Sequence, residues 1–153
     1  MRAVNIMSGI ITCTIVAVGL IGCGALIQNQ QIACLAKNVY FEARGESQSG
    51  QIAVANVTMN RVNSQHFPDT VCDVVYEPKQ FSWTHTVKNH TPQDKEMYQD
   101  IYKLAEKVYN GSIADITDGS TFYHADWVNP SWNRVMDRVI QIDTHIFYKH
   151  EGR

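Results

Sequence analysis

A glutamate near the end of a predicted helix is the residue best placed to do chemistry. Glu42 follows the aromatic residues Tyr40 and Phe41 and borders an apolar helix face. A carboxylate in such a place is partly removed from water, and burial disfavours its charged form and raises its pKa. A raised pKa suits a general acid that works near neutral pH. The alternative is a structural carboxylate at the edge of the core, paired with Arg44 or Lys37.

Two consecutive predicted helices position this glutamate. Apolar residues recur at helical spacing from Ile32 to Ala43, and Gly45 is predicted to end that helix as a left-handed cap. A second helix, with an almost entirely apolar body, is predicted from about residue 49 to Val62. Glu42 should therefore lie in the last turn of one helix and face a buried partner helix.

The remaining elements predict an α+β domain in which helices predominate. The pattern indicates a short helix around 71–76, a long helix over 92–109 with Thr91 as N-cap, and short strands over 120–124 and 145–149. Between the strands, a further helix is predicted after Asn129, carrying Trp132, Val135, Met136 and Val139. The two strands are expected to pair as a small sheet beside the helices.

The N-terminal segment predicts export and membrane attachment. Ile6 to Ile27 carry no charge, and a bilayer-spanning helix needs about 20 residues. Arg2 precedes them, which places the N-terminus in the cytoplasm and the rest outside. We therefore expect residues 1–31 to form a transmembrane signal-anchor with a short linker, and 32–153 to form the catalytic domain. A lipoprotein signal with the lipid on Cys23 is the competing interpretation.

A polar and aromatic cluster lies in the loop before the long helix. Gln80, Ser82 and Trp83 combine hydrogen-bonding groups with an aromatic face, as a sugar-binding groove requires. For Trp83, packing in the core under this loop is an interpretation as strong as sugar binding. For Phe81, packing in the core is the favoured interpretation.

Two cysteines of the predicted exported domain have two interpretations. Cys34 and Cys72 could form a disulfide, because the compartment permits it. Cys34 could instead be a thiol nucleophile with a histidine as base.

Composition excludes some partners. The formal net charge is −2 and the basic residues are scattered, so no nucleic-acid partner is expected. Two short pairs, His124 with Asp126 and Asp143 with His145, could bind zinc, but neither has the spacing of a strong metal motif. We therefore expect no metal and no cofactor.

Four blocks carry a resemblance to a known family: CLAKNVYFEARGESQSGQIAVANVTMNRV, FPDTVCDVVYEPKQFSW, FYHADWVNPSW and HIFYK. In this order they resemble the SleB/CwlJ-type cell-wall hydrolases, which include spore-cortex-lytic enzymes. The resemblance implies a lysozyme-like glycan-cleaving domain with Glu42 as the catalytic acid. It also implies that Tyr123 and His124 line the groove, and it favours the disulfide between Cys34 and Cys72.

The number of carboxylates decides which reaction is expected. Glycoside hydrolysis ordinarily uses two carboxylates. The candidates for a second carboxylate beside Glu42 are Glu46, Asp69, Asp73 and Asp126. Their spacing in the sequence does not favour any one of them. A lytic transglycosylase uses one carboxylate, and we expect that reaction on the peptidoglycan glycan strand. The alternatives are a membrane-tethered binding module without catalysis and a cysteine-dependent peptidoglycan amidase or peptidase.

The expected setting is the outer side of the bacterial inner membrane. The dilute apolar segment resembles the signal-arrest-release anchors of phage endolysins, which later leave the membrane. Lysis by a phage and wall remodelling by a cell both fit this description.

Overall fold

The computed structural model describes residues 11–150, and describes side chains from Cys23 onward. The chain divides between Gln30 and Gln31 into two compact units. Helix α1 runs over Ile11–Ala43. In the part of the chain with described side chains, no helix is both long and apolar enough to cross a bilayer. The predicted membrane segment, Ile6 to Ile27, falls mostly outside those residues.

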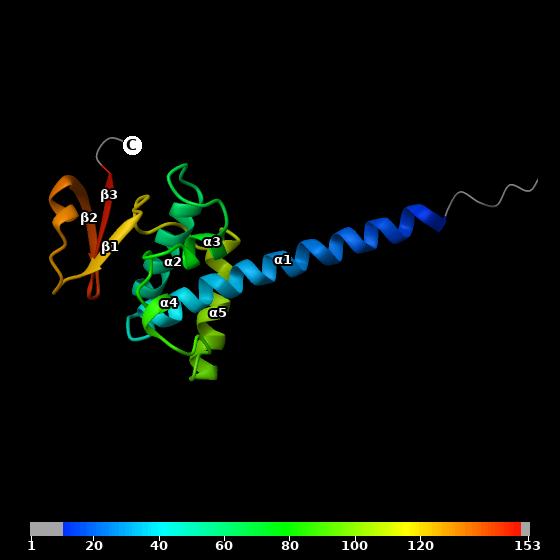
Figure 1. Ribbon diagram of the computed structural model, residues 1–153, viewed down its shortest axis with the longest axis horizontal. Coiled ribbons are helices and arrows are strands. Elements are labelled where there is room, and N and C mark those ends of the chain that lie inside the picture. Colours follow the sequence, from blue (N-terminus) through cyan, green and yellow to red (C-terminus); the bar gives the residue numbers. More distant parts are fainter. Residues whose placement is uncertain (1–10, 151–153) are drawn as a thin grey trace, which may run out of the picture. The chain divides into compact units, whose positions relative to one another are not determined.

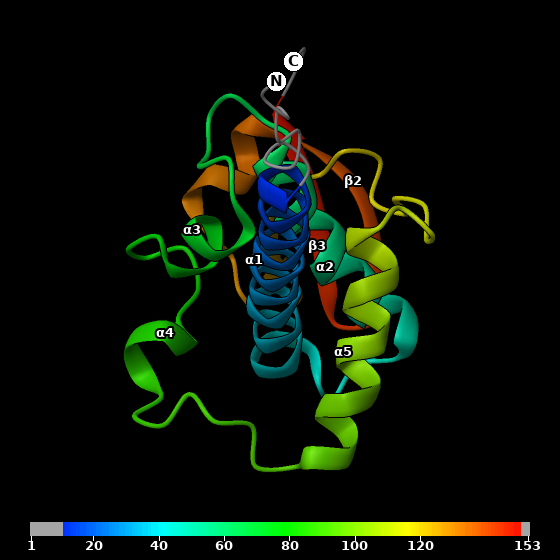
Figure 2. The same ribbon diagram turned by 90° about the vertical axis from the view of Figure 1, so that its right-hand side faces the viewer.

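Four more helices follow α1: α2 (Gln48–Val62), α3 (Val71–Tyr76), α4 (Trp83–Thr86) and α5 (Lys95–Tyr109). Figure 2 shows α3 and α4 on one side of the last part of α1, which belongs to the second unit, and α5 on the other. The core between them is built from apolar faces that the sequence pattern predicted, including Leu35 and Val39 of α1 and Ile101 of α5. The prediction of a mainly helical α+β domain is confirmed.

The ends of two helices differ from the prediction. Helix α5 begins at Lys95, not Pro92, because Asp94 is the N-cap and its side chain accepts a hydrogen bond from Met97 N (3.0 Å). Gly45 is not a left-handed cap, since the described glycines with positive φ are Gly111 and Gly119. The chain leaves α1 through a turn in which Glu46 N donates to the carbonyl of Ala43 (3.0 Å).

The sheet has three antiparallel strands, β1 (Phe122–Ala125), β2 (Met136–Ile142) and β3 (His145–His150), in the order β1-β3-β2 (Figure 1). The prediction of an α-helix after Asn129 is wrong. Only Ser131–Val135 is helical, as the short 3₁₀ helix η1, and the chain then enters β2. Met136 and Val139 therefore belong to a strand, because β2 finds hydrogen-bond partners along β3 and a turn at Asp143 joins the two.

The inner face of the sheet packs on α2. Phe147 of β3 is fully buried with Ala53 and Val57 of α2, and Tyr123 and Ile142 contact this cluster. Because side chains alternate along a strand, the next residue after Tyr123 must face the other way. This packing places Tyr123 of β1 against the face of α2 that carries Ala53 and Val57.

Candidate active site

A hydrogen bond between α1 and β1 marks the site. Tyr123 Oη donates to Glu42 Oε2 at 2.9 Å, although the two residues are 81 positions apart in the sequence. Glu42 lies in the last turn of α1 and is partly buried. The predicted placement of Glu42 at the edge of the core is correct.

The environment of Glu42 favours its protonated form. Burial raises the pKa of the Glu42 carboxyl, while the bond from Tyr123 and the charge of Arg61 act in the opposite direction. The pKa of Tyr123 is raised well above its ordinary value, first by burial and then by the charge of Glu42. Tyr123 therefore keeps its proton and acts as a donor, and Glu42 is available as an acid closer to neutral pH than an ordinary glutamate.

Arg61 of α2 supplies the buried positive charge of the site. It is 5% exposed, and its Nε donates to the carbonyl of Thr121 at 2.8 Å. Three phenylalanine rings surround its guanidinium carbon at 5.0–5.9 Å: Phe67, Phe81 and Phe122. Among the described residues its Nη1 has no hydrogen-bond partner. The aromatic faces hold the charge in place, so that it acts on Glu42 through the protein interior.

The predicted groove residues separate into buried and exposed ones. Trp83 is 3% exposed, its Nε1 donates to Asn38 Oδ1 (2.9 Å), and its ring stacks on Phe41 with centroids 4.6 Å apart. Trp83 therefore packs in the core, as does Phe81. Gln80 is partly exposed and Ser82 is exposed, and the backbone bonds around them stay within the turn 77–86.

The structure brings Tyr123, and not His124, to Glu42. His124 lies on the outer face of the sheet, where its Nε2 is 3.0 Å from Tyr148 Oη and its Nδ1 is 2.8 Å from the carbonyl of Ala125. Trp132 of η1 packs against its ring, with centroids 5.5 Å apart. The reason is the alternation of side chains along β1, which the sequence motif alone did not take into account.

The cysteine prediction is confirmed in its disulfide form. Cys34 and Cys72 are bonded and join α1 to α3. The thiol of Cys34 is therefore not free to act as a nucleophile in this state. Within the described residues, no three His, Cys, Asp or Glu side chains gather as metal ligands.

Sequence reasoning missed three features near the site. It did not connect Arg61 to Glu42, because the two lie on different helices. It did not foresee that the carboxylates of Glu46 and Asp143 join the segment after α1 to the turn after β2. It assigned no role to Trp127, which is 75% exposed and lies two residues after the end of β1. An aromatic residue beside Asp126 in a turn was the only available signal for the last of these.

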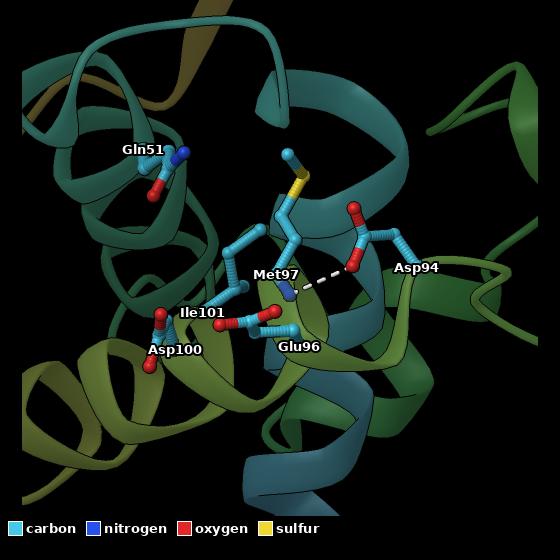
Figure 3. Close-up of a pocket in the computed structure, with 6 residues that line it drawn as sticks. All are labelled: Gln51, Asp94, Glu96, Met97, Asp100 and Ile101. Atoms are coloured by element: carbon cyan, nitrogen blue, oxygen red, sulfur yellow. Dashed lines mark hydrogen bonds between the residues drawn. The ribbon is translucent and has the colours of Figure 1, made fainter.

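Surface hollows lie elsewhere on the domain. The one in Figure 3, of about 340 Å³, lies beside the start of α5, and the carboxylates of Asp94, Glu96 and Asp100 line it together with Gln51, Met97 and Ile101. Asp94 there serves as the helix cap. Two others are lined by residues around Phe67 and around Lys107. Glu42 lines none of these three hollows.

Comparison with known proteins places this geometry in a family context. Residues 45–148 match the family described as Cell Wall Hydrolase, a range that begins three residues after Glu42. The spore cortex-lytic enzyme of Halalkalibacterium halodurans is 33% identical over 122 residues, which is 78% of this chain and 34% of that protein. That of Bacillus cereus is 34% identical over 121 residues, which is 77% of this chain and 44% of that protein. The chain thus spans less than half of these curated relatives.

Two solved structures share the fold. The catalytic domain of the Bacillus cereus SleB protein superposes with a TM-score of 0.64 at 32% identity, covering 80% of this chain and 91% of that one. The catalytic domain of the germination-specific lytic transglycosylase SleB from Bacillus anthracis gives a TM-score of 0.63 at 33% identity, covering 78% and 93%. Both comparisons cover most of the unit that begins at Gln31.

Proposed function

Because the chain belongs to the cell wall hydrolase family, we propose that it degrades peptidoglycan by cleaving the glycan strand, with Glu42 as its acid. One observation carries this proposal: the partly buried carboxyl group of Glu42 accepts the hydroxyl of Tyr123 at 2.9 Å. Burial raises the pKa of that carboxyl, as proton donation to a glycosidic oxygen requires. Glu42 is partly and not fully buried, which is compatible with access by the bond to be cut.

The reaction we propose is that of a lytic transglycosylase. Glu42 donates its proton to the oxygen between N-acetylmuramic acid and N-acetylglucosamine, and the bond from that oxygen to the anomeric carbon of the muramic acid breaks. The carboxylate then takes a proton from the 6-hydroxyl of the same muramic acid as this oxygen attacks the anomeric carbon. The products are a 1,6-anhydromuramic end and a free 4-hydroxyl, and Glu42 regains its proton. The likeness to a solved lytic transglycosylase supports this reaction.

The state of the other carboxylates favours a mechanism with one acid. Glu46 accepts two hydrogen bonds from Thr144, at 2.5 Å and 3.3 Å, and is therefore held in a structural contact. The carboxylate of Asp73 accepts a hydrogen bond from the hydroxyl of Thr70, which is the N-cap of α3. Asp69 and Asp126 are exposed, so neither has the burial that raises the pKa of Glu42. A hydrolase would need one of these groups, or a water that one of them activates, on the far side of the sugar ring.

The substrate contacts that we propose lie around Glu42. Tyr123 is the contact best supported, since it touches Glu42 directly. Gln80 and Ser82 remain candidates because they are accessible, whereas the burial of Trp83 and His124 argues for packing roles. Trp127, the exposed aromatic residue after β1, joins them as a candidate platform for a sugar ring.

We also propose that the N-terminal segment attaches the domain to the outer side of the bacterial inner membrane. The uncharged run from Ile6 to Ile27 after Arg2 supports this topology. Attachment there would hold the domain, residues 32–153, beside the peptidoglycan. A release of the anchor, as in phage lysis, and permanent tethering for wall remodelling are both compatible with the segment.

Zymography on purified sacculi tests the proposal. The full chain should clear peptidoglycan, and Glu42→Gln should abolish clearing while remaining folded, because the amide cannot donate the proton. Cys34→Ser should still clear it under conditions where the variant is folded. A binding module would give no clearing in any form, and an enzyme using the Cys34 thiol would lose activity with Cys34→Ser and keep it with Glu42→Gln.

A further inference from the structure

Two carboxylates form hydrogen bonds that link the connection after α1 to the turn after β2. Glu46, in the connection, accepts bonds from Thr144 Oγ1 (2.5 Å) and Thr144 N (3.3 Å). Asp143, in the turn, accepts bonds from Ser47 Oγ (2.6 Å) and Ser47 N (2.9 Å). Each segment therefore gives one carboxylate and binds the other. We call these four residues the crossed latch.

The crossed latch joins the two elements that carry the proposed acid and its donor. Glu46 comes four residues after Glu42, just beyond the end of α1. Thr144 directly precedes β3, and β3 pairs with β1 so that Tyr123 lies opposite Phe147. The latch therefore fixes the end of α1 to the sheet on which the phenol of Tyr123 is mounted.

The local sequence is built for this close approach. A Cβ at Gly50 would lie 2.5 Å from Asp143 Oδ2 and 2.7 Å from Glu46 Cβ, so only glycine leaves the space that the latch occupies. Asp143 itself has φ of +49°, in the left-handed region, which is costly for most residues and tolerated by aspartate. Ser47 is at once a latch residue and the N-cap of α2.

We propose that the crossed latch is a positioning device for catalysis, in which Thr144 and Glu46 hold Glu42 against Tyr123. The inference rests on the proposed function, and it assigns Glu46 to positioning instead of to a second catalytic carboxylate. A displacement of about 1 Å in a reacting group can reduce a rate about a hundredfold. A contact that fixes the end of α1 can therefore affect the reaction rate through the position of Glu42.

Charged groups around the latch and the acid are few. His145 Nδ1 of β3 lies 4.0 Å from Glu46 Oε1, and burial lowers the pKa of that histidine. Asp143 of the latch, His124 of β1 and Asp126 just after β1 also act on His145 electrostatically. On the side of Glu42, the facing groups are Tyr123 and Arg61. Removing the hydroxyl of Thr144 changes none of these charges directly, so it tests position alone.

The experiment compares three variants of the full chain in the cleavage of purified sacculi. Thr144→Val removes the hydroxyl that binds Glu46, and we expect it to lower kcat about tenfold or more with little change in KM. Thr144→Ser keeps the hydroxyl and should restore the rate. Thr70→Val is the matched control, since it removes a threonine hydroxyl that also donates to a carboxylate, that of Asp73 at the start of α3, and should leave kcat unchanged.

Two readouts separate positioning from a loss of stability. Loss of the latch should weaken the bond from Tyr123 that lowers the pKa of Glu42, so the alkaline limb of kcat/KM should move to higher pH in Thr144→Val, in the same direction as in Tyr123→Phe. In a Tyr123→Phe background the effect of Thr144→Val on kcat should shrink, because both changes disturb one contact. If Thr144→Val does not fold, Glu46→Gln, which keeps one acceptor oxygen, takes its place in the same comparison.

The outcomes are distinct. Loss of kcat in Thr144→Val with rescue by Thr144→Ser supports the latch. If Thr144→Val matches Thr70→Val in rate and pH profile, or if its effect is fully additive with Tyr123→Phe, the latch only stabilises the fold and the inference fails. If Glu42→Gln remains active, the proposed function itself fails, whatever the latch variants do.

Discussion

The carboxyl group of Glu42 lies under opposing influences. Burial raises its pKa, whereas the hydroxyl of Tyr123 and the charge of Arg61 stabilise the carboxylate and lower it. The proposed reaction needs both forms in turn, since in it Glu42 first gives a proton and then takes one. A carboxyl group tuned between these influences can do both at one pH.

Removing the hydroxyl of Tyr123 should move the pH dependence of the reaction upward. In Tyr123→Phe the carboxylate of Glu42 loses a stabilising bond, so the pKa of Glu42 rises further. The alkaline limb of kcat/KM, above which the acid has lost its proton, should shift to higher pH, measured from the clearing rate of sacculi across a pH series. A shift to lower pH would show that the bond from Tyr123 does not act on Glu42 in this way.

Glu42 should also make the protein less stable at high pH. Its pKa is raised in the folded state, so between the unfolded and folded values the folded protein binds more protons, and stability falls as pH rises through that window. Glu42→Gln does not titrate. Its Tm should therefore exceed that of the wild type above the window and converge with it below, in thermal unfolding at matched pH values. An equal difference at all pH values would contradict the burial of an ionising group there.

Among the helices and strands, the spacing of hydrophobic residues was sufficient to predict helices with a buried face. It was not sufficient to predict the strand at the edge of the sheet. The second helix and the short helix 71–76 were predicted closely because their apolar positions repeat at helical spacing. The run from Met136 to Ile142 was misread, because apolar residues in so short a segment fit either period. Only the pairing with β3, which is a tertiary contact, decides for a strand.

A candidate site residue could be predicted where neighbouring residues in one helix turn indicate it. Residues that only the folded structure brings together could not be predicted. Glu42 could be found from its place beside an apolar face, and Tyr123 only through a family resemblance. His124 and Trp83 were expected in the groove because the sequence gives their types but not the side on which they face. Arg61 became visible only in the folded structure, where the charges of Tyr123 and Glu42 act on it.

The bond between Cys34 and Cys72 should contribute strongly to stability. It closes a separation of 38 residues, for which the loop-entropy estimate is about 4 kcal/mol. Reduction should lower the free energy of unfolding by that order, measured by denaturant titration with and without reductant. Cys23→Ser is the control, since the thiol of Cys23 is free and exposed. If reduction leaves the midpoint unchanged, the disulfide does not staple α1 to α3 in solution.

For the whole molecule, the proposed anchor makes a separate prediction. The full chain expressed in a bacterial host should remain with the membrane fraction after carbonate extraction, because the uncharged run from Ile6 to Ile27 inserts into the bilayer. Cys23→Ala distinguishes the two forms of attachment, since a lipoprotein would lose its lipid and a spanning segment would not be affected. Recovery of the full chain in the soluble fraction would overturn membrane attachment and leave the cleavage chemistry untouched.

The most direct test of the account is the identity of the products. Purified sacculi are digested with the full chain and with Glu42→Gln, and the released fragments are analysed by mass spectrometry. The account predicts muropeptides ending in 1,6-anhydromuramic acid from the wild type and none from the variant. Release of the same fragments by Glu42→Gln would contradict the assignment of Glu42, and reducing ends without anhydro groups would contradict the transglycosylase reaction.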